Sequence, residues 1–165
     1  MKTEIERKWL LSGVPSENPD EIYDISQYYL KSSGEKTHRV RECKNIYENR
    51  YTWTETIKIP NGTISNEESE RFIKYDEFKD KSKEAYKVIH KQRKVYYING
   101  YKWEIDTISG DIILCELEFV VDGEPSQENI SEIMEVTIPP IISDLIIKEV
   151  SDDNGYSNFM LSEPI

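Results

Sequence analysis

The chain has 165 residues and a mass of 19.4 kDa, with 32 Asp and Glu against 21 Lys and Arg, so its formal net charge at pH 7 is −11. This length predicts a single domain over residues 1–165, and the negative charge argues against non-specific binding to nucleic acid or to an anionic membrane. Aromatic residues make up 11% of the chain, more than a disordered acidic chain carries, so we expect a folded protein.

Polar and apolar residues alternate through most of the chain, which predicts a mainly β (α+β) fold. The expected elements, in chain order, are strands at 2–11, 25–31, 37–44, 50–59, 67–74, 89–98, 101–108 and 111–121, with helices after Pro19, at 75–88 and 126–134, and a last turn near 156–161. Turn signals such as Asn61-Gly62, Asn99-Gly100 and Ser109-Gly110 separate neighbouring strands, so we expect antiparallel pairing.

The cysteines and the N-terminus predict the compartment. Cys43 and Cys115 form neither a disulfide framework nor a metal-ligand spacing. The first residues are charged where a secretory signal needs an apolar stretch, and no apolar run approaches the ~20 residues of a membrane span. We therefore expect a cytoplasmic protein without membrane attachment.

The first strand places charges on one face. Because side chains alternate along a strand, Glu4, Glu6 and Lys8 share one face, while Ile5 and Trp9 share the other. On one strand alone, such a face most often meets solvent.

Same-face charge pairs recur on further strands, however, and their signs are not mixed. The pairs are Arg39 and Arg41, Lys91 and Arg93, Glu104 and Asp106, and Glu116 and Glu118, with Lys58, Glu68 and Glu70 as weaker candidates. Like charges two residues apart bring no benefit on a solvated face. The pattern favours an eight-stranded antiparallel closed β-barrel whose interior is charged and whose apolar exterior is covered by a few helices.

This mixture of charges suits phosphate chemistry. Carboxylate clusters without His or Cys select hard cations, Mg²⁺ or Mn²⁺, whereas Arg and Lys bind phosphate oxygens. The chain contains no Gly-rich phosphate loop and no nucleophile elbow, so water is the expected nucleophile of a metal-assisted phosphoryl transfer. We expect Trp9, Trp53 and Trp103 to pack on the outer side, and no catalytic role for His38 or His90.

The run Glu4-Ile5-Glu6-Arg7-Lys8 resembles the Glu-x-Glu-x-Lys signature of the CYTH superfamily, the triphosphate tunnel metalloenzymes. Later family elements follow in order: Gln27 to Leu30, Arg39 and Arg41, Lys58, Glu68 and Glu70, Lys91 and Arg93, Trp103 to Asp106, Glu116 and Glu118, and a tail from Lys148 to Asn158. Asn66 stands where the family usually has Arg, and Ser151 where it has Thr.

The resemblance implies an eight-stranded tunnel that binds a triphosphate together with Mg²⁺ or Mn²⁺. It implies metal ligation by Glu4, Glu6, Glu116 and Glu118, and a second metal near Asp106 and Glu104 that positions the attacking water. The phosphate-binding residues would be Lys8, Arg39, Arg41, Lys58, Lys91 and Arg93, with Glu70 beside the substrate. The residues expected to carry catalysis are Glu4, Glu6, Lys8, Asp106 and Glu118.

The resemblance to this superfamily leaves three functions open. The first is a triphosphatase that hydrolyses inorganic tripolyphosphate, or else a nucleoside or thiamine triphosphate. The second is a class IV adenylyl cyclase, and the third is a non-catalytic module that binds a polyphosphate or a nucleotide. We expect a small-molecule triphosphate as the partner, and a monomer or homodimer.

Overall fold

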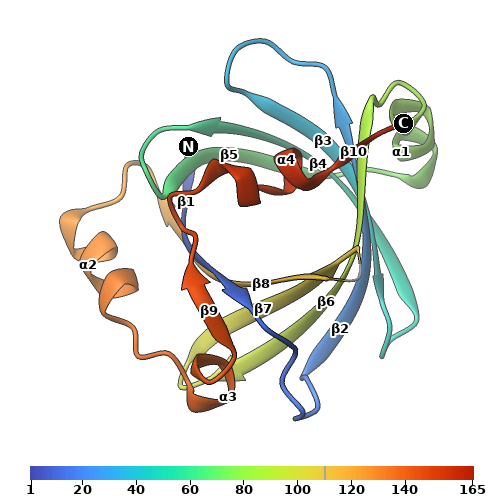
Figure 1. Cartoon of the computed structure of the whole chain (residues 1–165). Helices are drawn as coiled ribbons and strands as arrows, with labels where there is room; N and C mark the ends of the chain where they lie inside the picture. The colour runs from blue at the N-terminus through green and yellow to red at the C-terminus, as the bar shows by residue number, and fades with distance from the viewer. Residues whose placement is uncertain (110) are drawn as a thin grey trace.

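The computed structural model describes residues 1–109 and 111–165; of the predicted turn Ser109-Gly110, Gly110 lies outside the described residues. In the described chain, eight antiparallel strands close into a barrel (Figure 1), as predicted. Their bounds are β1 Lys2–Leu11, β2 Glu21–Leu30, β3 Thr37–Asn45, β4 Arg50–Pro60, β5 Ser65–Phe72, β6 Lys87–Ile98, β7 Tyr101–Ile108 and β8 Ile112–Asp122. The order around the barrel is β6-β2-β3-β4-β5-β1-β8-β7, and β7 pairs with β6 to close it.

Short elements decorate this barrel. They are α1 Tyr75–Ser82, α2 Gln127–Glu135, α3 Pro140–Ser143, β9 Ile146–Glu149, the 3₁₀ turn η1 Asn154–Tyr156, α4 Asn158–Leu161 and β10 Glu163–Pro164. Figure 1 shows α2 and α3 outside the barrel on one side, α1 on the other, and α4 over the barrel opening. Among the described helices, none has both the length and the apolar character needed to cross a bilayer.

One helix prediction is wrong, and a second is wrong in part. The stretch after Pro19 is not helical, because the chain there pairs with β6: the Asp20 amide donates to the Val95 carbonyl, and β2 begins at Glu21. The helix predicted over 75–88 ends at Ser82, because Lys87 and Val88 already pair with β2. The elements α3, β9 and β10 were not predicted. Asn99 and Gly100, both at positive φ, form the predicted tight turn between β6 and β7.

The main core lies outside the barrel wall, between β1, β7 and β8 and the helices α2 and α3. Trp9 and Trp103 are almost fully buried, and their ring centroids are 5.7 Å apart. Ile133 of α2 and Ile142 of α3 are fully buried in the same cluster. This outer apolar face fixes the register, because a slip of one residue would turn these side chains into the barrel. The prediction that Trp9 and Trp103 pack outside is confirmed, and Trp53 is partly buried against the apolar cluster beneath α1.

Helix α1 is tied to the barrel by a buried carboxylate. Glu55 of β4 accepts hydrogen bonds from His38 (2.7 Å), Lys81 (2.7 Å) and Arg71 (2.9 Å from Nε). Burial alone would raise the pKa of Glu55, but the bonds from Lys81, His38 and Arg71 lower it to about 2. His38 is therefore a structural partner of Glu55, as its place on the outer face predicted.

We expect Glu55→Gln to destabilise the protein by about 1 to 2 kcal/mol at pH 7, a modest loss because water screens the partly exposed Arg71 and Lys81. The folded-state pKa of Glu55 lies below its ordinary 4.5, so the stabilisation is complete above pH 4.5 and disappears as the pH falls toward 2. Urea unfolding of both proteins between pH 3 and pH 7 measures this. A difference in stability that does not change with pH would contradict it.

Candidate active site

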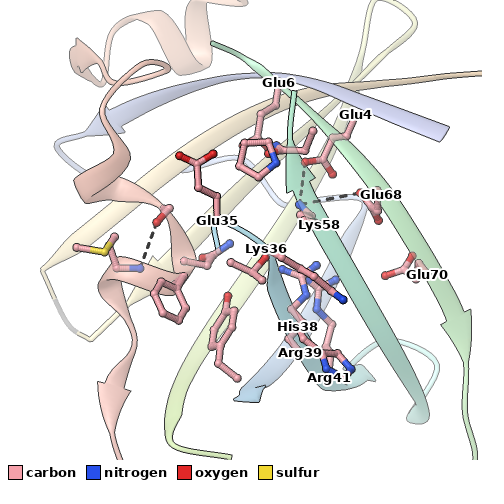
Figure 2. Close-up of a pocket in the computed structure, with 18 of the residues that line it drawn as sticks. Glu4, Glu6, Glu35, Lys36, His38, Arg39, Arg41, Lys58, Glu68 and Glu70 are labelled. Atoms are coloured by element: carbon pink, nitrogen blue, oxygen red, sulfur yellow. Dashed lines mark hydrogen bonds and ion pairs between the residues drawn. The ribbon is translucent and has the colours of Figure 1, made fainter. Parts of the chain in front are cut away.

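The barrel encloses a cavity of about 710 Å³ whose wall is mostly charged (Figure 2). Every strand of the barrel contributes to its lining, and on every strand except β2, which contributes Tyr29 and Leu30, the lining includes charged side chains. Most residues predicted for the site line it, namely Glu4, Glu6, Lys8, Arg39, Arg41, Lys58, Glu70, Arg93, Glu104, Glu116 and Glu118. Lys91 and Asp106 lie behind this lining and are almost completely buried.

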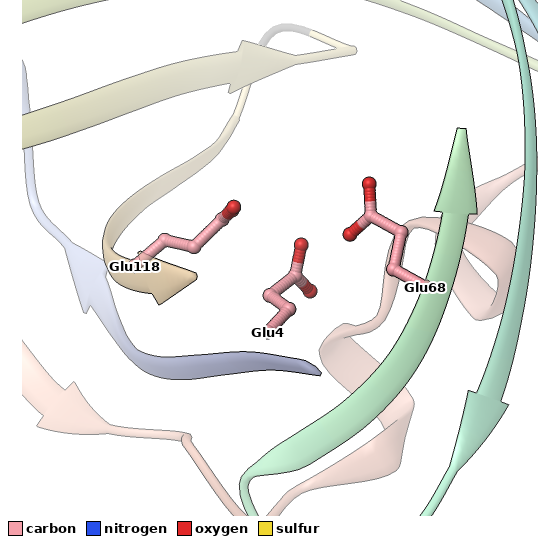
Figure 3. Close-up of side chains that lie close together, drawn as sticks. All are labelled: Glu4, Glu68 and Glu118. Carbon is pink, nitrogen blue, oxygen red and sulfur yellow. The ribbon is translucent and has the colours of Figure 1, made fainter. Parts of the chain in front are cut away.

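Three carboxylates from neighbouring strands converge in the cavity. Glu4 of β1, Glu68 of β5 and Glu118 of β8 each place a carboxylate oxygen within 4.8 Å of the others (Figure 3). Strand β1 lies between β5 and β8, which brings the three side chains together. Lys58 Nζ lies 2.8 Å from Glu4 Oε1 and 4.0 Å from Glu68 Oε2, so one lysine compensates part of this negative charge.

A second group of carboxylates shares Glu118. Glu6, Glu116 and Glu118 also place one oxygen each within 4.8 Å of one another. The register of β1 against β8 creates this group, because Glu6 stands opposite Glu118 and Lys8 opposite Glu116. Lys8 Nζ lies 3.3 Å from Glu116 Oε1.

Crowding of negative charge shifts the proton affinity of these groups. Burial, reinforced by Glu116 and Glu4, raises the pKa of Glu6 to about 7. Burial and the neighbouring Glu4 raise the pKa of Glu68 to about 7 and that of Glu118 well above its ordinary value. Buried carboxylates that repel one another and offer only oxygen ligands fit a hard divalent cation, which removes the repulsion.

Asp106 and Glu104 are held by cations instead. Arg93 donates to both Asp106 oxygens (2.8 and 2.9 Å) and to Glu104 (2.8 Å), and Lys91 Nζ lies 2.7 Å from Asp106. Burial would raise the pKa of Asp106, but Arg93 and Lys91 hold it well below its ordinary value. In the described structure, neither carboxylate joins the two groups that contain Glu118.

We expect Arg93→Ala to destabilise the protein by about 3 to 5 kcal/mol, because it leaves the buried Asp106 and Glu104 with less compensation. The loss is measured as a lower midpoint of chemical unfolding. An Arg93→Ala protein as stable as the wild type would contradict the ion-pair network. Lys94→Ala, on the opposite face of β6, is the control and is expected to change stability little.

Arg39 and Arg41 differ from every other predicted cation of the site. Neither guanidinium forms an ion pair with a carboxylate of the described residues, although both point into the cavity from β3 (Figure 2). The buried Nε of Arg39 has no hydrogen-bond partner there. Burial, together with the positive charges of Arg39 and Arg93, lowers the pKa of Arg41 to about 10. The cavity thus contains two guanidinium groups without a carboxylate ion pair among the described residues, an arrangement that suits an anion.

The C-terminal segment 154–161 closes one side of the cavity. Lys8 Nζ donates to the Tyr156 carbonyl (3.1 Å), and Lys91 Nζ donates to Asn158 Oδ1 (3.1 Å). The Phe159 ring packs against Tyr29, with ring centroids 5.3 Å apart. Inward-facing apolar residues of the barrel, among them Ile89, Ile108 and Leu114, complete the closure. The charged centre of the cavity is therefore covered on this side.

Comparison with known proteins finds matches among solved structures only. No protein-family model matches the sequence, and no curated protein matches it significantly. Among solved structures, the inorganic triphosphatase NE1496 is 22% identical, with 95% of each chain covered and a TM-score of 0.60. A conserved hypothetical protein from Pyrococcus furiosus is 19% identical over 80% of this chain and 86% of that one, with a TM-score of 0.59. The chain therefore shares the closed β-barrel fold of these two structures.

A third solved structure with a similar fold is a putative adenylate cyclase from Vibrio parahaemolyticus, which is 12% identical to this chain. It covers 80% of this chain and 82% of its own length, with a TM-score of 0.56. The structures that share this fold therefore include one described as an inorganic triphosphatase and one described as a putative adenylate cyclase.

The tunnel contains functional candidates to which the sequence assigned no role. Glu68 was expected only to face inward, yet it completes the first carboxylate group; its same-face spacing to Glu70 was the available signal. Glu70 itself lies at the exposed rim, where Thr56 donates to it at 2.8 Å. Gln27 and the C-terminal contacts had no signal beyond their place in the family pattern.

Proposed function

We propose that this protein is a divalent-metal-dependent triphosphatase that hydrolyses the terminal phosphoanhydride of inorganic tripolyphosphate. One observation carries the proposal. One cavity inside the barrel holds two groups of convergent carboxylates and, separately, two guanidinium groups that form no ion pair with a carboxylate of the described residues. Acidic groups that fit a hard cation and basic groups that fit a polyanion are what metal-assisted phosphoryl transfer requires.

The carboxylate groups are the proposed metal site. Glu4, Glu68 and Glu118 would hold one Mg²⁺ or Mn²⁺, and Glu6, Glu116 and Glu118 would hold another. A bound divalent cation neutralises phosphate charge and lowers the pKa of a water molecule. Lys8 and Lys58 contact carboxylates of these groups, and we propose that they also donate to phosphate oxygens of the substrate.

The remaining predicted residues take related parts. Arg39 and Arg41 would bind the phosphate chain through charge-assisted hydrogen bonds. Lys91 and Arg93 contact the carboxylate oxygens of Asp106. For Asp106 and Glu104 to help hold a second metal, as the sequence predicted, these two cations would have to turn away from Asp106 and toward the phosphate. Asp106 could then accept a hydrogen bond from the attacking water.

Inorganic tripolyphosphate is favoured over an organic triphosphate because the described cavity wall is dominated by charge. The Phe159 ring makes T-shaped contacts with Tyr29 and Tyr86, and Lys87 Nζ lies 4.2 Å from its centroid, so the ring is already engaged within the protein. A nucleoside or thiamine triphosphate is the alternative hydrolase substrate. The class IV adenylyl cyclase is the second candidate, favoured by the similarity to the putative adenylate cyclase.

The test is a panel of substrates and metals. The purified protein is incubated with tripolyphosphate, ATP or thiamine triphosphate, each with Mg²⁺, Mn²⁺ or EDTA. We expect orthophosphate release to be fastest from tripolyphosphate and to stop with EDTA. Cyclic AMP from labelled ATP without tripolyphosphate hydrolysis would assign the cyclase, and tight binding of unchanged tripolyphosphate would assign the binding module. Gel filtration distinguishes a monomer from a homodimer, the two states that the sequence left open.

A further inference from the structure

Gln27 of β2 is a fully buried polar residue inside the tunnel. It has no exposed surface, and both ends of its side-chain amide are bonded. Gln27 Oε1 accepts hydrogen bonds from Arg41 Nε (3.0 Å) and Nη2 (2.5 Å), and Gln27 Nε2 donates to Tyr29 Oη (3.0 Å). Burying an amide costs free energy unless its oxygen and its nitrogen are both hydrogen-bonded, so these bonds fix the orientation of the Gln27 side chain.

The partner of Arg41 is unusual because it is neutral. The other paired cations of the tunnel contact carboxylates, namely Lys8 with Glu116, Lys58 with Glu4, Lys91 with Asp106, and Arg93 with Asp106 and Glu104. A carboxylate beside Arg41 would hold the guanidinium equally well and would cancel its charge. The amide oxygen of Gln27 holds it and leaves the charge intact.

The hydrogen bonds to Gln27 also determine which N–H donors of Arg41 remain available to a ligand. Gln27 uses Nε and Nη2 of Arg41, and Nη1 makes no hydrogen bond to the described residues. Tyr29, the cross-strand neighbour of Arg39, fixes the Gln27 amide from its other end. Phe159 of the C-terminal segment packs against Tyr29. A chain of contacts therefore runs from Phe159 through Tyr29 and Gln27 to Arg41 and supports the orientation of its guanidinium.

We propose that Gln27 is a positioning residue that fixes the Arg41 guanidinium for a phosphate chain without neutralising it, and that Tyr29 orients the Gln27 amide. This role rests on the proposed function and specifies how that site selects a polyanion. The discriminating substitution is Gln27→Glu. The introduced carboxylate would have the same size as the amide and could still accept both bonds from Arg41, and Tyr29 could donate its hydroxyl proton to the second oxygen.

The experiment measures tripolyphosphate binding by calorimetry without metal, and KM and kcat with Mg²⁺. For Gln27→Glu we expect binding about tenfold weaker or worse and a raised KM, with a smaller change in kcat and no loss of thermal stability. If the charge of Arg41 played no part in binding, the added ion pair would leave binding unchanged. Gln27→Met, which keeps the volume and removes the acceptor, should also weaken binding, now with a loss of stability.

A double-mutant cycle and a matched control complete the design. Arg41→Ala should change binding much less in the Gln27→Glu background than in the wild type, because the two residues act as a unit. Gln92→Glu, at an exposed glutamine on the outer face of β6, adds the same charge elsewhere and should leave binding within about twofold.

The outcomes separate the two proposals. A wild-type protein that binds and hydrolyses tripolyphosphate, with a Gln27→Glu variant that binds equally well, overturns the positioning role alone. Additive effects of the two substitutions also overturn it. A wild-type protein that binds tripolyphosphate without hydrolysis overturns the triphosphatase, while the binding data still decide the role of Gln27. A wild-type protein that does not bind it overturns both.

Discussion

Glu118→Gln is expected to reduce metal-dependent phosphate release by at least about 100-fold, because Glu118 belongs to both carboxylate groups of the tunnel. Glutamine keeps the shape of the side chain and loses the charge that a divalent cation needs. Initial rates with tripolyphosphate and Mg²⁺ over a range of metal concentrations measure the loss. More metal should restore little of the activity, because one substitution weakens both groups.

The same variant should not be less stable in EDTA. The pKa of Glu118 is raised in the folded protein, so the ionised side chain disfavours folding at pH 7, and the neutral amide removes that cost. Thermal unfolding should show an equal or higher midpoint than the wild type without metal, and a smaller rise when Mg²⁺ is added. Glu128→Gln, on the exposed face of α2, is the control. Full activity of Glu118→Gln would exclude the proposed metal site.

Arg41→Ala is expected to raise the KM for tripolyphosphate by about 10- to 100-fold, the effect of losing one or two charge-assisted hydrogen bonds. A smaller change in kcat is expected if Arg41 binds the substrate equally in the ground state and the transition state. Steady-state kinetics at saturating Mg²⁺ measure both constants.

Stability should distinguish this arginine from Arg93. Removing Arg41 reduces repulsion with Arg39 and Arg93, which offsets part of the free energy lost with the Gln27 bond, whereas removing Arg93 leaves buried acids with less compensation. Arg41→Ala should therefore unfold at a higher denaturant concentration than Arg93→Ala. Arg50→Ala, at an exposed arginine paired with Glu48, is the kinetic control. An unchanged KM for Arg41→Ala would show that the phosphate chain binds elsewhere.

Much of the barrel could be predicted from local pattern. The alternation in β1 separates Glu4, Glu6 and Lys8 from Ile5 and Trp9, and the same period of two recurs in β3, β7 and β8. Because this period is a property of each strand by itself, it predicted which residues face the interior. Helix ends were predicted less well: α1 stops at Ser82 because Lys87 and Val88 form ladder bonds with β2, a partner remote in sequence.

The pairing of charges inside the tunnel could not be predicted in the same way. The sequence made Asp106 a candidate metal ligand, and the structure gives both of its oxygens to Arg93 and Lys91. Glu68 joins Glu4 and Glu118 only because β5 and β8 flank β1. Which acid meets which base depends on the register and tilt of strands that are distant along the chain.

The sequence by itself determined the mainly β architecture, the inward-facing charges and the chemistry those charges suit, because strand periodicity and residue type are local properties. The tertiary structure decided which charges remain free. It pairs Lys8, Lys58, Lys91 and Arg93 with acids, whereas Arg39 and Arg41 form no ion pair within the described part of the chain, and Arg41 is supported by a neutral amide. Which charged side chains come within ion-pair distance depends on how the strands are aligned across the barrel. These contacts form only when all eight strands are paired in register.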